Sequence, residues 1–266
     1  MIREITIGQY YQTDSIIHRL DPRVKLVGTI LYIISLFLYK KPLPFGVAAV
    51  FLAVYVLLSK VPFSYIIRGL KTIVILMLFT ACFNVFLTPG EVVFSYGILS
   101  VTREGIRAAV FMMIRLVMLI ISSSLMTLTT TPTQLTDAME KLLWPLTKIK
   151  LPVHEVAMMM SIALRFIPIL LEETDKIMKA QMARGADFET GNLFRRIKAM
   201  VPLLVPLFIS AFRRANDLAM AMEARCYQGG NGRTKMKPLR YALRDSAAYV
   251  VILLYFAAVI ATGKLL

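Results

Sequence analysis

Hydrophobic residues form long uninterrupted runs along this chain, and short polar or proline-containing segments separate them. Five runs approach the ~20 residues that a helix needs to cross a bilayer, at about 24–39, 43–59, 72–87, 106–130 and 246–262. The strands of a membrane barrel would be short and alternating, whereas these runs are continuous. We therefore predict an all-α polytopic membrane protein with about five transmembrane helices.

The segments between the later runs are longer and more varied. Pro89 and Gly90 end the third run, and residues 91–102 are expected to be irregular or partly β. After the fourth run, Thr133 or Thr136 can cap an amphipathic helix over 134–149. These patterns predict a hairpin-like or surface segment first and a membrane-associated helix second.

Residues 153–230 are too charged for an ordinary span and too apolar for an ordinary cytosolic tail. They contain two helical units, 153–182 and about 193–225, each with internal proline and a charged second half. We expect both helices to lie along the membrane surface with charged ends projecting. The predicted domains are an N-terminal membrane domain (1–131), a cytoplasmic or interfacial domain (132–245) and a final transmembrane helix (246–266).

Each of these units ends in a tripeptide of the same form. The two tripeptides are Ala183-Arg184-Gly185 and Ala224-Arg225-Cys226, whose arginines are 41 positions apart. A basic residue at a helix C-terminus is favoured by the helix dipole, and glycine by the helix end, so one such arginine needs no function. Its duplication favours a protruding tip that inserts into a groove, where a guanidinium binds carboxylates or carbonyls.

The net charge of +15 sets the orientation of the chain. Residues 131–245 hold 18 of the 31 lysines and arginines, against 11 of the 16 acidic residues. Basic segments stay on the cytoplasmic side, where they also meet anionic lipids. We therefore predict a cytoplasmic N-terminus, a cytoplasmic 131–245 block and an external C-terminus. Basic residues are not interleaved with aromatics as in a surface for nucleic acid.

Residue patterns for catalysis or metal binding are lacking. His18 and His154 are far apart, Cys82 and Cys226 offer no disulfide framework, and no nucleophile–base pair stands out. Residues 69–72 lack the glycine and Gly-Lys pair of a phosphate-binding loop. We expect no metal, no cofactor and no enzyme activity, and any ATP would be bound by partner subunits.

The start of the first span carries a dense signature that includes Ser15, His18, Asp21, Pro22, Arg23 and Lys25. Asp21 is a good N-cap and Pro22 suits the first helical position. Arg23 and Lys25 are expected to snorkel to the headgroups. A well-made helix start explains this signature by itself. The first 23 residues are polar and mixed, so no cleavable signal peptide is expected.

Arg115 lies within the fourth run, where an ionisable residue is costly. It has either a structural hydrogen bond or a functional role, and the sequence does not choose between them.

Taken together, the signature at 15–25, the two Ala-Arg-small tripeptides and the long basic insert before the last span resemble the T component (EcfT) of energy-coupling factor transporters. The match spans most of the chain, and the paired tripeptides are its most specific part. Cys226 departs from the glycine common at that position, although cysteine is still small.

The resemblance implies a transmembrane scaffold of an ATP-driven importer of vitamins and micronutrients in the prokaryotic cell membrane. Arg184 would dock in one cytoplasmic ABC ATPase and Arg225 in the other, through coupling helices. A membrane S component, one or several interchangeable, would bind the substrate. Nine of the 16 methionines fall between Met139 and Met222. They either fill gaps in a membrane-facing core or form an adaptable surface for such partners.

The alternative function is a stand-alone secondary transporter or channel. Such proteins usually show inverted repeats, broken helices or intramembrane acids along an ion path. The spans here contain almost no acidic residues, which favours the scaffold.

Overall fold

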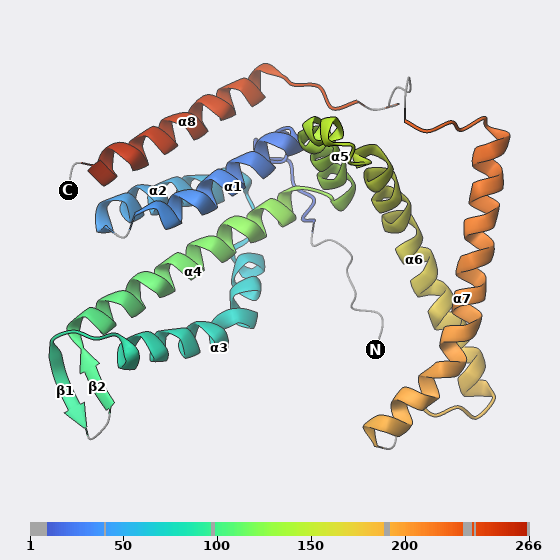
Figure 1. Ribbon diagram of the computed structural model, residues 1–266, viewed down its shortest axis with the longest axis horizontal. Helices are drawn as coiled ribbons and strands as arrows, with labels where there is room; N and C mark the ends of the chain where they lie inside the picture. Colours follow the sequence, from blue (N-terminus) through green and yellow to red (C-terminus); the bar gives the residue numbers. More distant parts are fainter. Residues whose placement is uncertain are drawn as a thin grey trace. The chain divides into compact units, whose positions relative to one another are not determined.

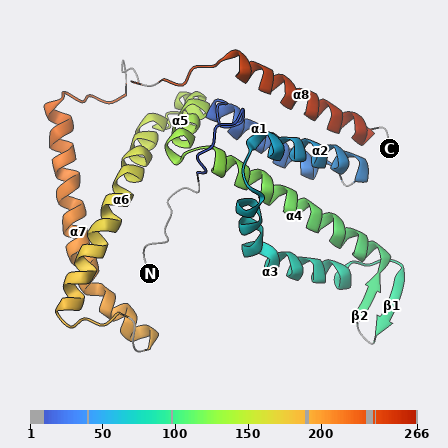
Figure 2. The same cartoon turned by 180° about the vertical axis from the view of Figure 1, so that it is seen from behind.

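The structure is a computed structural model that describes residues 10–39, 41–96, 99–188, 192–230, 236 and 238–264. Its elements, in chain order, are α1 (Pro22–Leu38), α2 (Pro42–Ser59), α3 (Phe63–Leu87), β1 (Val92–Tyr96), β2 (Leu99–Thr102), α4 (Arg103–Thr129), α5 (Pro132–Leu143), the 3₁₀ helix η2 (Trp144–Ile149), α6 (Val153–Ala183), α7 (Leu193–Ala224) and α8 (Leu243–Lys264) (Figures 1 and 2). The all-α prediction is confirmed. Within the segment expected to be partly β, β1 and β2 pair antiparallel.

The chain forms two compact units, which are considered separately. The bundle unit comprises Gly8–Ala138 and Leu239–Leu266, and so contains α1 to α4 and α8. The arm unit, in its described part, comprises Met139–Pro238 and contains α6 and α7. The bundle unit is therefore built from the two ends of the chain, and the arm unit is inserted between α4 and α8.

The core of the bundle unit joins α1, α2, α4 and α8. Its buried side chains include Tyr32, Leu36, Leu52, Leu125 and Val259. Polar groups inside this core bond to one another, as the Ser35 hydroxyl does with the Tyr255 hydroxyl at 2.5 Å. Such pairing is needed wherever water is absent, because an unpaired polar group in hydrocarbon is costly.

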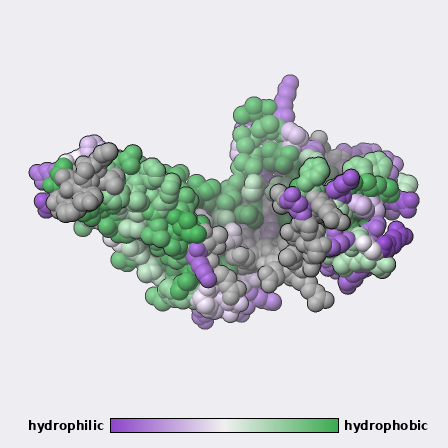
Figure 3. Space-filling model, turned by 90° about the horizontal axis from the view of Figure 1, so that it is seen from below, coloured by the Kyte–Doolittle hydropathy of each residue, from purple (hydrophilic) through white to green (hydrophobic). Residues whose placement is uncertain are grey.

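The outer surface of the bundle unit is hydrophobic. Ile75 and Leu78 on α3, Leu57 on α2 and Leu253 on α8 are all exposed. Hydrophobic residues dominate much of the bundle surface visible in Figure 3. Water-soluble proteins rarely expose apolar patches of this extent, whereas a bilayer covers them at no cost.

Among the residues that the structure describes, four helices, α2, α4, α6 and α8, are long and apolar enough to cross a membrane. The count becomes five if α3 is one span, since its halves Phe63–Lys71 and Ile73–Leu87 are bent by 56°. The predicted number of about five transmembrane helices therefore agrees with the structure, but the helices that make up the five differ. α1 has only 17 residues, and α6, expected along the membrane surface, also meets the length and composition of a span. Pro168 lies inside α6 without dividing it.

The start of α5 differs from the prediction. Thr131, rather than Thr133 or Thr136, caps it: the Thr131 hydroxyl accepts from the Gln134 N–H (3.3 Å) and the Gln134 side chain accepts from the Thr131 N–H (3.1 Å). This reciprocal capping box is favoured because Pro132 is suited to the first helical position. The α-helix also stops at Leu143, and η2 follows across Pro145, which lacks the N–H that a continuing helix requires.

Candidate functional site

The first Ala-Arg-small tripeptide forms a Schellman turn at the end of α6. The Gly185 N–H donates to the Met182 carbonyl (2.9 Å), and the Ala186 N–H donates to the Gln181 carbonyl (3.0 Å). Gly185 has a φ of +88°, the left-handed conformation that glycine adopts without strain. Arg184 is the C-cap residue of the helix.

The second tripeptide ends α7 with the same set of bonds. The Cys226 N–H donates to the Glu223 carbonyl (2.8 Å) and the Tyr227 N–H to the Met222 carbonyl (3.0 Å). Cys226 also takes the left-handed conformation, with a φ of +55°. From the sequence, the small third residue suits close approach of a partner. In the structure it also occupies the position where a left-handed backbone is required, so cysteine is a strained substitute for glycine.

All six residues of the two tripeptides are exposed. In the part of the chain that the structure describes, neither the Arg184 nor the Arg225 side chain makes a hydrogen bond or ion pair. Each guanidinium therefore has its donors available at a helix C-terminus, where the dipole favours a positive charge. We call these two exposed ends the arginine tips.

An ion pair joins the two arm helices at matching positions. The Arg214 guanidinium on α7 donates to the Glu173 carboxylate on α6 at 2.8 Å. Each of these residues lies 11 positions before the arginine of its own tip, since 184 − 173 and 225 − 214 are both 11. Eleven helical residues span roughly 16 Å, so both tips lie the same distance along their helices from this contact. Figure 1 shows the helices running in opposing directions, which places the tips at opposite ends of the pair.

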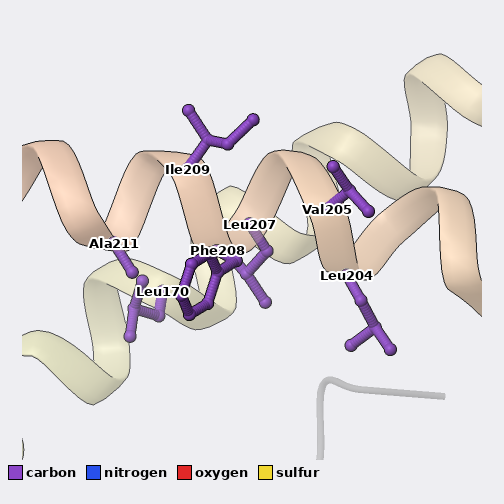
Figure 4. A pocket seen from close by; sticks show the side chains of 7 residues that line it. All are labelled: Leu170, Leu204, Val205, Leu207, Phe208, Ile209 and Ala211. Atoms are coloured by element: carbon purple, nitrogen blue, oxygen red, sulfur yellow. The ribbon is translucent and has the colours of Figure 1, made fainter.

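An apolar groove lies beside this contact. It has a volume of about 510 Å³ and is lined by Leu170 of α6 and by Leu204, Val205, Leu207, Phe208, Ile209 and Ala211 of α7 (Figure 4). Phe208 is 73% exposed and Leu204 59%. The middle of the arm unit therefore presents an uncovered hydrophobic surface between its two charged ends.

The signature at the start of α1 forms a buried charged junction in the bundle unit. Asp21 caps the helix as predicted, accepting from the Arg23 N–H at 2.9 Å. Its carboxylate also binds the Arg23 guanidinium through two bonds of 2.9 and 2.8 Å. Burial raises the pKa of Asp21, but the bonds from Arg23 outweigh it, so the pKa lies below its usual value. Pro22 occupies the first helical position, and the guanidinium stacks on Tyr241 at 3.7 Å.

The sequence did not single out Asp245, which completes this junction. Its carboxylate is 1% exposed and accepts from the Asp21 N–H and from the Ala242 N–H, both at 2.8 Å. The second bond is half of a capping box at the start of α8. The sequence does hold a signal for Asp245, because it is an acidic residue at the start of the last apolar run.

The expectation that Arg23 and Lys25 snorkel to the headgroups is wrong. The Arg23 side chain is 11% exposed and Lys25 is 4% exposed. The Lys25 ammonium donates to the Thr129 carbonyl at 2.7 Å and to the His18 carbonyl at 3.2 Å. Carbonyls at helix ends lack intrahelical partners, and the end of α4 therefore supplies an acceptor for a buried ammonium.

His18 is held by two hydrogen bonds, one to each ring nitrogen. Its Nε2 lies 3.0 Å from the Tyr11 carbonyl, which can only accept, and its Nδ1 lies 2.7 Å from the Ser15 hydroxyl. Nε2 therefore carries a proton, and in the neutral ring Nδ1 accepts from the Ser15 hydroxyl. Burial of the ring is the main cause that lowers the pKa of His18 below 6.5.

Arg115 has neither an ion pair nor a hydrogen bond from its buried Nε among the described residues. Its guanidinium instead lies 5.1 Å from the centre of the Phe37 ring and 5.3 Å from that of Phe45. Cation–π contacts thus replace the structural hydrogen bond that was one of the two interpretations from sequence.

The described residues contain no cluster of three His, Cys, Asp or Glu side chains that could hold a metal ion. Cys82 and Cys226 are both free thiols. The structure thus places the predicted residues in two separate settings: His18, Asp21, Pro22 and Arg23 lie in the bundle unit, and the six tip residues lie in the arm unit.

Apolar helices of membrane-spanning length, joined to an arm with exposed basic tips, define an integral membrane protein. The CbiQ family model, described as a cobalt transport protein, matches residues 13–236. The energy-coupling factor transporter transmembrane protein EcfT of Clostridium kluyveri is 58% identical over 250 residues, 93% of each chain. EcfT of Bacillus subtilis is 49% identical over 258 residues, 97% of each chain. The chain belongs to this EcfT family of energy-coupling factor transporter transmembrane proteins, which confirms the resemblance.

Replacing Asp245 by alanine is expected to lower the free energy of unfolding by roughly 2 kcal/mol or more, because two buried N–H groups lose a charged acceptor. Asp245→Asn, which keeps one acceptor oxygen, should cost less. Thermal unfolding in detergent measures both variants. Asp217→Ala, at an exposed carboxylate on α7, is the control. Equal midpoints for the Asp245→Ala and Asp217→Ala variants would contradict this role for Asp245.

Substitutions at the third residue of each tip should have opposite effects on the stability of the two helix ends. Cys226→Gly removes the cost of a left-handed non-glycine residue, whereas Gly185→Ala introduces it, each by about 1 kcal/mol. Hydrogen–deuterium exchange of the last turns of α6 and α7 measures both changes. Slower exchange is expected in α7 of the first variant and faster exchange in α6 of the second. Changes of the same sign would rule out the conformational explanation.

The neutral His18 should make stability depend on pH. Because its pKa is lower in the folded state than in the unfolded chain, its contribution is full above pH 6.5 and is lost as pH falls through the folded pKa. The difference in melting temperature between the parent chain and His18→Gln should therefore shrink as pH is lowered from 7.5 to 5. A difference that stays constant over this range argues for a charged imidazole.

Proposed function

We propose that this protein is the non-catalytic scaffold subunit that couples ATP hydrolysis to import in an energy-coupling factor transporter, an ABC importer of vitamins or related micronutrients. Two cytoplasmic ABC ATPase subunits bind and hydrolyse the ATP. A membrane S component, one or several interchangeable, binds the substrate. This chain links the two activities as a multi-pass protein of the prokaryotic cell membrane.

The observation that carries the proposal is the pair of matched arginine tips. Two helix ends with the same hydrogen-bond pattern expose Arg184 and Arg225 with no partner among the described residues. The guanidinium fork binds carboxylates and carbonyls in a groove through several bonds at once. In this proposal one tip docks in each ATPase, and the tripeptides Ala183-Arg184-Gly185 and Ala224-Arg225-Cys226 form the two docking surfaces.

The apolar surface between the tips supports a membrane partner. The groove lined by Leu204 and Phe208 is open and hydrophobic, and a second membrane protein offers a complementary surface. Met178 lies on α6 of the same unit, and flexible methionines adapt to different partners. We assign this surface to the S component, so that α6 and α7 act as coupling helices between it and the ATPases.

Charge supports the orientation that this arrangement requires. The 131–245 block holds most of the basic residues of the chain, and such segments remain cytoplasmic. With that block inside, the N-terminus is also cytoplasmic, and anionic membrane lipids contact the basic residues near the membrane surface.

Arg184→Ala and Arg225→Ala should each weaken ATPase binding by ~2 kcal/mol, about 30-fold, because truncating a docked arginine removes an anchor. The double variant should assemble and transport less than either single variant. Co-purification with the ATPases and uptake by the reconstituted transporter measure these losses.

Lys179→Ala and Arg213→Ala are matched controls, since both remove an exposed cation from the same helices away from the tips. Normal assembly and transport by the double variant would disprove the docking role. Solute transport by this chain reconstituted alone would favour a stand-alone transporter instead.

A further inference from the structure

After the second arginine tip, the chain folds back onto the start of α6. Figure 1 shows the segment that follows α7 running back toward that end of α6. Tyr227 follows Cys226 in the sequence, and its hydroxyl donates to the Met158 sulfur at 3.1 Å. Tyr227 also contributes its N–H to the Schellman turn. One residue thus belongs both to the second tip and to a contact with α6.

Two glycines bring the chain close to α6, for different reasons. Gly229 has a φ of +90°, a turn conformation that other residues adopt only with strain. Gly230 has no such conformation, but a Cβ added there would overlap the His154 ring. Glycine is therefore required at 230 because its backbone lies directly against the imidazole.

The imidazole is itself held in place from α5. The His154 Nδ1 lies 2.9 Å from the Glu140 carboxylate, whose residue is 7% exposed. The second tip is therefore connected through Tyr227 and Gly230 to Met158 and His154, and from there to α5. We call these residues, with Glu140, the return latch.

The first arginine tip cannot share this latch. Arg184 lies 30 residues beyond His154 on the same helix, roughly 45 Å along its axis. Within the described residues it is connected to the base of α6 through the helix itself and through the packing of α6 on α7, which includes the Glu173–Arg214 pair. The two tips, alike in sequence and in local backbone, thus have different mechanical connections.

We propose that the return latch positions the Arg225 tip and ties its movement to the start of α6, so that the two arginine tips are not mechanically equivalent. The inference rests on the proposed function, in which both tips dock with ATPases. Displacement of Arg225 then moves the base of α6 directly, whereas displacement of Arg184 acts through the length of α6. Tyr227, Gly230 and His154 are positioning residues in this arrangement and do not contact the ATPase.

Nitroxide labels at the two tips test the latch in the full-length chain in lipid nanodiscs. With Cys82→Ser, Cys226 is the sole cysteine and carries the label. Adding Gly185→Cys and Cys226→Ser moves the label to the matching position of the first tip. Gly230→Val, which drives a side chain into the His154 ring, should raise label mobility at 226 several-fold and leave it unchanged at 185. Gly46→Ala is the control, because a Cβ at Gly46 meets open space.

A double-mutant cycle identifies the contact. If Gly230 and His154 act through each other, Gly230→Ala should add nothing to the effect of His154→Ala on the label at 226. Tyr227→Phe, which removes only the hydroxyl, should give a smaller increase in mobility. Unchanged mobility at 226 with Gly230→Val, equal changes at both tips, or additive effects in the cycle would each overturn the latch.

A functional test uses the complete reconstituted transporter. Gly230→Val should lower transport several-fold and loosen the ATPase contact at Arg225 but not at Arg184, measured by crosslinking at each tip. Loss at both tips would overturn the latch. A mobility change confined to 226 supports the latch even if Arg225→Ala leaves ATPase binding intact, a result that counts only against the proposed function.

Discussion

The buried carboxylate of Asp245 is the contact on which the bundle unit depends. By accepting from the Asp21 N–H and the Ala242 N–H, it joins the starts of α1 and α8, which are far apart in sequence. Lys25 extends the same junction to the Thr129 carbonyl at the end of α4. The chain leaves the bundle unit after Ala138, beyond Thr129, and returns to it at Leu239, shortly before Ala242. The segments that lead to and from the arm therefore continue from helix ends that this buried charged junction holds together.

The arm unit is held differently, with specific polar contacts concentrated at three places. The Glu173–Arg214 pair fixes the helices against each other, and a Schellman turn fixes each tip. Between these points the side chains of α7 are largely exposed and hydrophobic. Rigid ends joined by an uncovered apolar middle suit a part that completes its packing only in a complex. A bundle with buried carboxylates and an arm with exposed arginines therefore divide stability and recognition between them.

Much of this architecture could be predicted from the sequence because its signals are local. Apolar runs gave the helices, Asp21 with Pro22 gave the start of α1, and the repeated Ala-Arg-small pattern gave both tips. What escaped prediction depends on residues distant in sequence. Neither the burial of Lys25 nor the pairing of Asp245 with Asp21 has a local pattern, since each partner is supplied by another helix. The Thr131 cap was missed for a local reason, because the preference of Pro132 for the first helical position was overlooked.

The matched positions of Glu173 and Arg214 make their contact a pivot with two equal arms. When α6 and α7 turn about this contact, their two arginine tips move through equal arcs. Any such movement changes the angle between the axes of the two helices. Movements applied at Arg184 and Arg225 are thereby converted into rotation of the apolar middle, where Phe208 and Leu204 lie. Equal arms also give neither arginine tip a leverage advantage over the other at this pivot. A mechanical difference between the two tips must then arise at the ends of the arms, as at the return latch, rather than at the pivot.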